Sequence, residues 1–413
     1  MRRRRSHNLA VRPLAAVAAL LAALALAAAG SAQTRADGAL QQRLARALRV
    51  PHVSLSQTGA LAVELSTGRA IFARNAGAPF APASTEKLPV TFAALNVLGP
   101  SFRFQTDVLG EGSQQGAVWR GSLVLQGHGD PTLSRSDLRT LARQLRGLGL
   151  RRITGPVLGD ESWFDSRRTA PGWKASFYLN ESPPLSALAV DRAHYHGAVS
   201  TQPALGAALA FRDALRAAGI AVAGQVTTGR ADAEAFPLAS VSSATLTSIV
   251  RSMDLASDNF TAELLLKELG AVAADRGTTA AGAVVVTKQL AAADVPLAGV
   301  RIVDGSGLSL LDRLTPNALV GILEAAWTTP QLKDRFVAAL PVAGVSGTLQ
   351  DRMRRAPARG NVVAKTGTTS EASALSGFVR GRYVFAVLNN GHPVSSWWAR
   401  VAQDHFATVL AAQ

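Results

Sequence analysis

Alternating and helical hydrophobic patterns follow one another along this chain. Residues 59–72 alternate short apolar runs around a Thr-Gly turn, which predicts a strand hairpin. Residues 85–98 carry apolar side chains at helical spacing and end at a Gly-Pro pair, which predicts a helix. Pro89 removes an early backbone hydrogen bond and is expected to loosen or kink the first turn. Ser84 therefore lies at the start of this helix, and Lys87 faces the same side one turn later.

The middle of the chain has a different hydrophobic pattern, in which short predicted strands alternate with amphipathic helices. Strands are predicted within 121–127 and 153–164, and helices within 138–149 and 206–218. We expect residues 101–231 to form one inserted α/β accessory domain.

Long helical patterns return from about residue 240. They cover 245–253, 260–269 and 280–293. Three strand patterns and an amphipathic helix close the chain, at 361–367, 373–381, 382–390 and from Ser396. About 380 residues exceed one typical core, so 33–100 together with 232–413 are expected to form a second, discontinuous domain.

The first 32 residues have the composition of a secretory signal peptide. Five arginines precede or enter an apolar run over 14–29, and small residues follow it up to Ala32. Sixteen apolar residues are short of the roughly 20 that cross a bilayer, so we expect a cleaved signal at 1–32 rather than a retained anchor. The protein is therefore expected to be exported, to the periplasm or to the cell wall.

Composition narrows the possible functions. The chain has no cysteine, which excludes disulfides, a lipid-modified amino-terminal cysteine and cysteine metal sites. Removing residues 1–32 lowers the formal charge from +15 to +10, which remains strongly basic. The arginines are scattered without interleaved aromatics, so we expect no nucleic-acid partner. The basic charge fits peripheral association with an anionic envelope, or it reflects an arginine-rich composition alone.

Lysine is rare here, which makes one lysine informative. Six lysines accompany thirty-seven arginines, and one of the six, Lys87, stands three residues after Ser84. Arginine stays protonated in proteins, whereas a buried lysine can lose its proton and act as a base. Ser84 is therefore a candidate nucleophile.

Three short motifs occur in order, Ser84-Thr85-Glu86-Lys87, Ser257-Asp258-Asn259 and Lys365-Thr366-Gly367. Each alone has a simpler explanation: the first could be a chance match, because serines are common, the second triplet fits a helix cap, and the third fits an edge-protecting charge before a turn. Together, on a helix start, a loop and a strand, they indicate a catalytic site.

This trio resembles the serine penicillin-binding proteins and β-lactamases. Most of the mature chain is similar to one branch, the class C D-alanyl-D-alanine carboxypeptidase/endopeptidases. The similar segments are 84–106, 129–133, 159–165, 171–173, 186–191, 304–309 and 344–353. The resemblance implies an α/β (α+β) fold: a transpeptidase-like catalytic domain, with an antiparallel sheet flanked by helices, and one inserted accessory domain. It implies no metal and no cofactor.

The resemblance also implies roles for the motif residues. Ser84 would attack the penultimate D-alanine carbonyl, and neutral Lys87 would take its proton, although the base is disputed in this superfamily. Ser257 would relay that proton to the leaving D-alanine, and Asn259 would orient Lys87 and the peptide. Asp258 would point away and cap a helix.

The strand motif would bind the substrate. Lys365 would supply positive potential for Ser257 and for the terminal carboxylate, which Thr366 and Thr368 would hydrogen-bond. Gly367 would let the peptide backbone approach the strand edge. The backbone N–H groups of Ser84 and Thr368 would form the oxyanion hole.

The chain departs from the family in length. Ser84 and Ser257 are 173 positions apart, whereas the family carries a longer insert that usually folds as two extra domains. The shortfall falls after Asp191, so we expect one accessory domain, with the usual third domain missing or vestigial.

Other polar clusters are weaker candidates. Asp191, His194 and His196 alternate as in a metal site, but no further ligand is evident and loop histidines are the better interpretation. Asp160, Glu161 and Asp165 have the form of a glycosidase acid pair and are more simply structural. Trp397 and Trp398 are expected to cover the core, with exposure near a membrane as the alternative.

The sequence thus favours an exported serine D-alanyl-D-alanine carboxypeptidase or endopeptidase. Its expected partners are peptidoglycan stem peptides, with β-lactams as covalent inhibitors. A β-lactamase or esterase is one alternative, although no Glu-x-x-Leu-Asn motif follows Ser257. A non-catalytic wall-binding protein is the other, and the sequence leaves the oligomeric state open.

Overall fold

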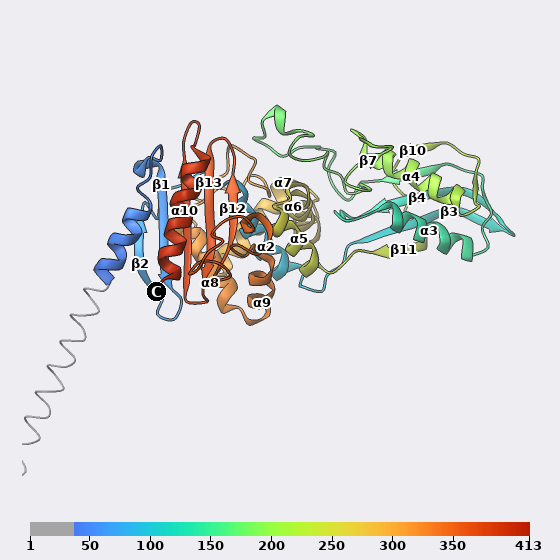
Figure 1. Cartoon of the computed structure of the whole chain (residues 1–413). Coiled ribbons are helices and arrows are strands. Elements are labelled where there is room, and N and C mark those ends of the chain that lie inside the picture. Colours follow the sequence, from blue (N-terminus) through green and yellow to red (C-terminus); the bar gives the residue numbers. More distant parts are fainter. Residues whose placement is uncertain (1–36) are drawn as a thin grey trace, which may run out of the picture.

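The computed structural model describes residues 37–413, and the expected signal peptide at 1–32 lies outside them. Figure 1 shows an elongated molecule whose two parts lie end to end, each built around its own sheet. The mixed α/β architecture agrees with the expected fold class.

The first sheet has five antiparallel strands in the order β12-β13-β14-β1-β2. The predicted hairpin is β1 and β2, and the three carboxy-terminal strand patterns are β12, β13 and β14. Their bounds are β1 Thr58–Glu64, β2 Arg69–Arg74, β12 Val362–Thr368, β13 Ala372–Val379 and β14 Tyr383–Asn390.

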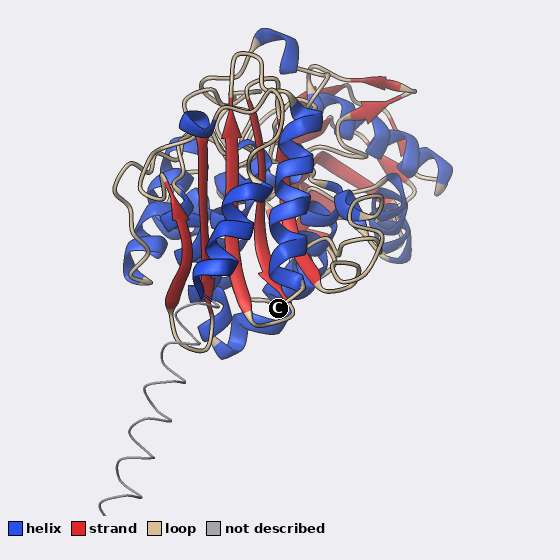
Figure 2. Cartoon of the chain, turned by 60° about the vertical axis from the view of Figure 1, so that its left-hand side comes forward, coloured by secondary structure: helices blue, strands red, loops and turns tan. Residues whose placement is uncertain are grey.

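Helices cover both faces of this sheet, because its strands are apolar on both sides. In β14, Val384, Ala386 and Leu388 face one apolar core, while the alternate residues Phe385 and Val387 face another. The second core is closed by α10 (Ser396–Ala411) and by the helix that ends at residue 47, and Figure 2 shows helices lying on this face of the sheet.

The other face carries a helical bundle that surrounds α2 (Lys87–Val97). The surrounding helices are α5 Leu246–Ala256, α6 Asn259–Ala274, α7 Thr279–Ala292, α8 Pro316–Thr328 and α9 Pro330–Ala339. Every residue from Lys87 to Leu95 is buried, so α2 is a central helix without a solvent face.

The start of α2 explains how Pro89 is accommodated. A 3₁₀ turn, η2 (Ala83–Glu86), precedes the α-helix, which begins only at Lys87. Pro89 is therefore the third residue of α2, where a helix leaves backbone N–H groups without intrahelical partners. The expected disturbance is confined to the 3₁₀ turn that carries Ser84.

The second part contains a seven-stranded mixed sheet with α3 (Arg135–Gly147) and α4 (Pro203–Ala217) packed on it. Its strands are β3 Gln105–Gln115, β4 Val118–Gly127, β5 Arg152–Ile153, β6 Val157–Asp160, β9 Ala221–Val222, β10 Val226–Thr228 and β11 Phe236–Ser242. Strand β11 pairs with β3, so this sheet continues beyond residue 231, where the accessory domain was expected to end.

The region of the expected shortening is compact. After Asp191 the chain forms only a two-stranded ribbon, β7 (His194–Tyr195) and β8 (Ala198–Val199), before α4 begins. Among the helices described from residue 37 onward, none combines the length and apolar character needed to cross a membrane.

Candidate active site

Ser84 lies in the 3₁₀ turn η2, in the middle of the molecule's larger part. Its hydroxyl oxygen is 3.1 Å from the Nζ atom of Lys87 at the start of α2. The turn is fixed by Thr85, whose hydroxyl donates to the Pro82 carbonyl at 2.7 Å. The local spacing of the first motif therefore places the hydroxyl and the amine in contact, as the sequence predicts.

The Lys87 amine has two carbonyl acceptors besides Ser84. It donates to Asn259 Oδ1 at 2.9 Å and to the Ser306 backbone oxygen at 2.7 Å. A neutral amine has two N–H bonds and one lone pair. With both N–H bonds directed to carbonyl oxygens, the lone pair is left for the Ser84 hydroxyl proton.

Burial favours the neutral form of this amine. Burial lowers the pKa of Lys87 to about 8, while the carboxylates of Asp304, Asp254, Asp258 and Glu263 act in the opposite direction. Lys87 therefore loses its proton much nearer to neutral pH than an exposed lysine does.

Sequence reasoning named residues 304–309 as part of the family resemblance but assigned no role to this loop, which supplies the Ser306 carbonyl. Asp304 holds this loop by accepting from the backbone N–H groups of Ser306, Gly307 and Ser309 at 3.1, 2.7 and 2.7 Å. Glu263 Oε1 accepts from Ser306 N at 2.9 Å. The Asp-Gly-Ser-Gly segment at 304–307 was the available signal, because such a segment favours a tight turn.

The second motif forms the turn between α5 and α6. Ser257 ends α5 in the left-handed conformation (φ 58°), which costs a non-glycine residue about 1 kcal/mol. Asp258 caps α6 by accepting from Phe260 N at 3.1 Å, and Arg192 pairs with its carboxylate. Asp258 therefore points away from the amine, as expected, while Asn259 contacts Lys87.

The third motif brings Lys365 to Ser257. On β12, Lys365 Nζ donates to Ser257 Oγ at 2.8 Å and to the Thr366 carbonyl at 2.9 Å. Burial, reinforced by the charge of Lys87, lowers the pKa of Lys365 to about 7. Two like charges in one buried site disfavour each other, so the two amines do not readily carry protons at the same time.

Gly367 passes directly beside the nucleophile turn. A Cβ atom on it would lie 2.9 Å from both Ser84 N and Pro82 O, which is closer than real Cβ atoms approach. The glycine is thus required by the approach of η2 itself. This close approach places the backbone of Ser84 next to β12, the strand that also carries Thr368.

The remaining strand residues have partners that the sequence did not indicate. Thr366 donates to the hydroxyl of Thr348 at 2.7 Å. Arg400, on α10, donates from Nη2 to Thr368 Oγ1 at 3.4 Å. Arg400 is exposed and lies 32 residues away in sequence, so no motif spacing points to it.

A segment of the second part lies over this site. The indole N–H of Trp173 donates to Asp304 at 2.8 Å, and Asn259 Nδ2 donates to the Glu181 carbonyl at 3.0 Å. Lys174 pairs with Glu371 at 2.9 Å, just beyond β12. The segment therefore contacts the Asp304 loop, Asn259 of the second motif and the turn that follows β12.

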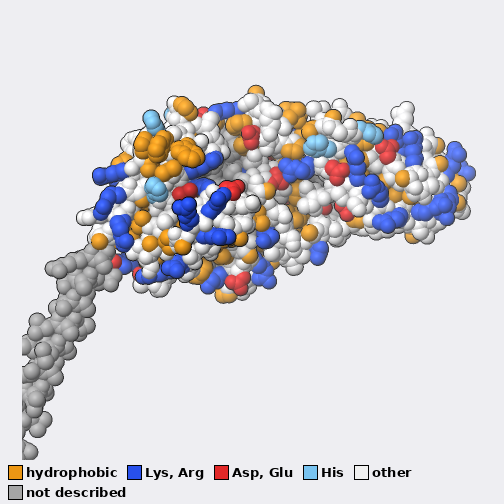
Figure 3. All heavy atoms as spheres, viewed as in Figure 1, with side chains coloured by type: hydrophobic (Ala, Val, Ile, Leu, Met, Phe, Trp, Pro, Cys, Tyr) orange, Lys and Arg blue, Asp and Glu red, His pale blue; other side chains and the backbone are white. Residues whose placement is uncertain are grey.

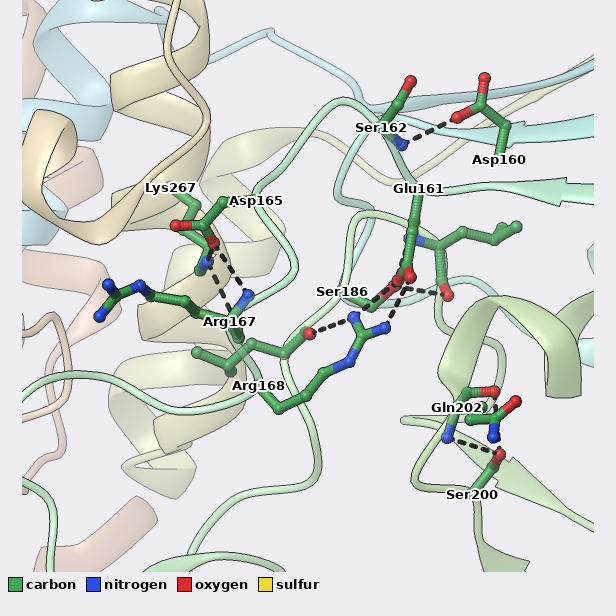
Figure 4. Close-up of polar contacts among 12 residues, drawn as sticks. Asp160, Glu161, Ser162, Asp165, Arg167, Arg168, Ser186, Ser200, Gln202 and Lys267 are labelled. Atoms are coloured by element: carbon green, nitrogen blue, oxygen red, sulfur yellow. Dashed lines mark hydrogen bonds and ion pairs between the residues drawn. The ribbon is translucent and has the colours of Figure 1, made fainter. Parts of the chain in front are cut away.

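Asp160, Glu161 and Asp165 each have structural partners (Figure 4). Asp160 accepts from Ser162 N at 2.8 Å, and Glu161 pairs with Arg168 at 2.6 Å. Asp165 pairs with Lys267 of α6 and so ties the two parts of the molecule together. These contacts agree with the structural interpretation of the three acids.

The histidines after Asp191 lie in the short β7–β8 ribbon. His194 Nδ1 is 3.0 Å from the Asp191 carbonyl oxygen, and His196 packs against Tyr195. Within residues 37–413, no group of three or more histidine and acidic side chains is placed to hold a metal ion.

The expectation that Trp397 covers the core is wrong. Its side chain is 70% exposed at the start of α10, while Trp398 is half-buried with its ring centroid 6.3 Å from that of His52. The core face of α10 is formed instead by residues such as Phe406. The sequence analysis did not single out Phe406, because it does not belong to a conspicuous pair of aromatic residues.

Comparison with known proteins identifies the family. The chain matches the D-Ala-D-Ala carboxypeptidase 3 (S13) family over residues 40–207 and 196–413. It is 32% identical to a D-alanyl-D-alanine carboxypeptidase of Actinomadura sp. strain R39, with 99% of this chain and 90% of that protein covered. That alignment runs over 494 positions, more than the 413 residues of this chain, so the relative contains segments that this chain lacks.

Solved structures show the same fold. Penicillin-binding protein 4 of Haemophilus influenzae superposes with a TM-score of 0.78 at 23% identity, with 91% of this chain and 98% of that chain covered. A structure of the same protein complexed with a novel β-lactam gives a TM-score of 0.72 at 24% identity. The resemblance stated from the motifs is confirmed, and the chain belongs to the D-Ala-D-Ala carboxypeptidase 3 (S13) family.

Proposed function

We propose that this protein removes the terminal D-alanine from peptidoglycan stem peptides through an acyl-enzyme on Ser84. Membership of the S13 family makes it a D-alanyl-D-alanine carboxypeptidase. The observation that carries the mechanism is the arrangement around Lys87, whose amine contacts Ser84 Oγ while its other contacts are two carbonyl oxygens.

Acylation begins when the neutral Lys87 amine takes the Ser84 proton. The serine oxygen then bonds to the carbonyl carbon of the penultimate D-alanine, and the carbonyl oxygen becomes an oxyanion between the N–H groups of Ser84 and Thr368. Gly367 supports this step by keeping β12 close to η2. One such donor typically contributes about 10² to 10³ in rate.

The leaving group departs by way of Ser257. The proton held on Lys87 reaches the terminal D-alanine nitrogen through the Ser257 hydroxyl, and the peptide C–N bond breaks. Lys365 orients this hydroxyl from 2.8 Å. Water then attacks the ester carbon, and Ser84 recovers its proton as the shortened peptide leaves.

The substrate carboxylate decides where the proton of the lysine pair resides. An anion bound at Thr366 and Thr368 lies beside Lys365 and raises the pKa of that amine. A protonated Lys365 in turn disfavours a proton on Lys87. Substrate binding therefore promotes the base form of Lys87.

Arg400 completes the carboxylate site in this proposal. Its guanidinium already reaches Thr368 Oγ1, and planar guanidinium groups bind carboxylates through paired hydrogen bonds. This residue would favour substrates that carry a free carboxylate next to the departing amine.

The proposal extends to inhibition, location and domain roles. A β-lactam ring carries an amide and a carboxylate like those of the peptide end, so it would acylate Ser84; the fold relative from H. influenzae binds such a compound.

We place the protein outside the cytoplasmic membrane, where peptidoglycan lies. We also propose that residues 101–231 with β11 form an accessory domain, and that the usual third domain is missing.

A labelled penicillin tests this function against its alternatives. Stable labelling at Ser84, located by peptide mass, supports the carboxypeptidase. Rapid turnover of the label would instead favour a β-lactamase, and no reaction would favour a non-catalytic wall-binding protein. Incubation with monomeric and cross-linked muropeptides, followed by mass analysis, then separates terminal trimming from cross-link cleavage.

A further inference from the structure

The second part of the molecule carries a basic furrow between α3 and α4. Two hollows of about 260 and 280 Å³ lie side by side there and share Arg139, Ala214 and Ala217 in their walls. Figure 3 shows Lys and Arg side chains gathered over these helices. The active-site mechanism uses none of these residues.

The arginines of α3 form a row along the furrow. Arg135, Arg139 and Arg143 stand four residues apart, so they lie on one helix face at intervals of about 6 Å. The opposite face of α3 is buried through Leu138, Leu141, Ala142 and Leu145. The row is therefore held in place by the packing of the helix behind it.

Most of the positive charge in this row is not neutralised. Arg139 and Arg143 are exposed, and within the described residues neither pairs with an acid; Arg143 donates only to Thr140 Oγ1, at 2.9 Å. The hollow shared by Arg139 and Arg143 has no acid in its wall. Partial burial and the neighbouring Arg151 lower the pKa of Arg146 in the same helix, as expected where cations crowd together.

The acid that lines the furrow, and the acid that pairs with the first arginine of the row, are already engaged. Asp213, in the first hollow, accepts from Tyr195 Oη at 3.0 Å and pairs with Arg212 at 3.1 Å. Asp191 pairs with Arg135 at 3.2 Å. The free cations are therefore Arg139 and Arg143, and they face an alanine-lined strip of α4.

We propose that this furrow binds a linear phosphodiester polymer of the cell wall. Guanidinium groups bind phosphate oxygens through paired hydrogen bonds, and a row at about 6 Å suits a chain with one charge per repeat. The furrow is concave and bounded by two helices, which fits a single chain better than the plane of a bilayer. That the polymer belongs to the cell wall rests on the proposed location of the protein. That the furrow binds a polyphosphodiester rests only on its shape and its arginines.

Calorimetric titration of the purified protein with poly(glycerol phosphate) of defined length tests this site. The double variant Arg139→Gln/Arg143→Gln should weaken binding by about tenfold or more, and it should reduce the slope of log affinity against log salt by about two. The matched control is Arg120→Gln/Arg230→Gln, which removes the same charge elsewhere. Trp119 faces the core that α3 and α4 close, so Arg120, next to it on β4, points to the other face of the sheet.

An equal loss in both double variants would overturn the proposal, because net charge alone would then explain the binding. Tighter, arginine-dependent binding to phosphatidylglycerol vesicles than to the polymer would overturn it as well, in favour of a membrane. Release of D-alanine from a short peptide is measured in parallel and should be unchanged in both variants. If the unmodified protein released no D-alanine, that result would count against the proposed function, and the binding result would still stand.

Discussion

A Cβ atom added to Gly367 would lie 2.9 Å from the backbone nitrogen of Ser84. The strand that carries Lys365 and the turn that carries the nucleophile thus touch at the point where the oxyanion is expected to form. The contact joins residues that are nearly three hundred positions apart in the chain.

Gly367→Ala should therefore lower kcat/KM by at least about 10²-fold, because moving β12 away from Ser84 removes one oxyanion donor. The loss should appear mainly in kcat, since the donor acts in the transition state. Gly147→Ala is the control: an added Cβ there meets nothing within 4 Å, and it should leave activity unchanged. Normal kcat in the Gly367 variant would show that this approach is not needed for catalysis.

Ser84→Ala should abolish both penicillin labelling and D-alanine release. The Ser84 side chain is partly exposed within an otherwise buried turn, and its hydroxyl is hydrogen-bonded to Lys87, so thermal unfolding should shift little. Intact-protein mass after incubation with penicillin measures the labelling. An adduct that persists in this variant would move the nucleophile to another residue.

Lys87→Arg should be nearly as damaging as loss of the nucleophile, although the charge is preserved. Arginine does not give up its proton, and a general base contributes about 10² to 10⁴ in rate. Lys288→Arg, on the exposed side of α7, should retain full activity.

The pH profile adds a second check on the same residue. Burial lowers the pKa of Lys87 to about 8 and that of Lys365 to about 7, and the proposed active form has Lys87 neutral and Lys365 protonated. In the unmodified enzyme kcat/KM should therefore rise with pH as the lysine pair loses its first proton and fall as it loses the second. A kcat/KM that declines with pH from the acid side, without a rising limb, would contradict the base assignment.

Arg400→Ala should raise KM for a peptide with a free terminal carboxylate by about tenfold, the worth of one charge-assisted hydrogen bond. The same peptide with an amidated end should bind equally poorly to the variant and to the unmodified enzyme. Arg400→Lys should recover part of the loss, because it keeps the charge without the paired geometry. Equal effects of Arg400→Ala on both peptides would exclude a role in carboxylate binding.

Glu86→Gln should make the protein less sensitive to alkaline pH. Both carboxylate oxygens of Glu86 are buried without a hydrogen-bond partner, and burial together with Asp304 and Glu263 raises its pKa well above 4.5. The folded protein therefore holds a proton that the unfolded chain releases, so this group's contribution to stability declines as pH rises above about 4.5.

Thermal unfolding of the two proteins between pH 5 and pH 9 measures this effect, because both values lie above the usual glutamate pKa of about 4.3 and Glu86 of the unfolded chain is therefore ionised throughout. The difference in Tm, variant minus unmodified, should increase with pH. A difference that is constant across this range would mean that Glu86 has no raised pKa in the folded state.

Three ordered motifs were enough to predict the residues of the central cluster and the family, and the resemblance to that family implied the fold class. The spacing of Ser84 and Lys87 is local, and a single helical turn brings three-residue neighbours together whatever surrounds them. The helices α2, α5, α6 and α7 were predicted for the same reason, because the spacing of their apolar residues can be read within a short stretch of sequence. No helix was predicted in the stretch before β12, although the structure forms α8 and α9 there.

Only the tertiary structure could decide the contacts made across long separations. The Ser306 carbonyl on Lys87, Arg400 beside Thr368 and the turn of Ser84 against Gly367 join segments whose distance in space no local pattern encodes. The exposure of Trp397 was misjudged for a related reason, because an aromatic pair at a helix start does not reveal which face the sheet covers. The sequence by itself thus identified the groups that are proposed to carry the chemistry, and packing decided which further groups hold them, because burial and long-range approach arise only when the whole chain has folded.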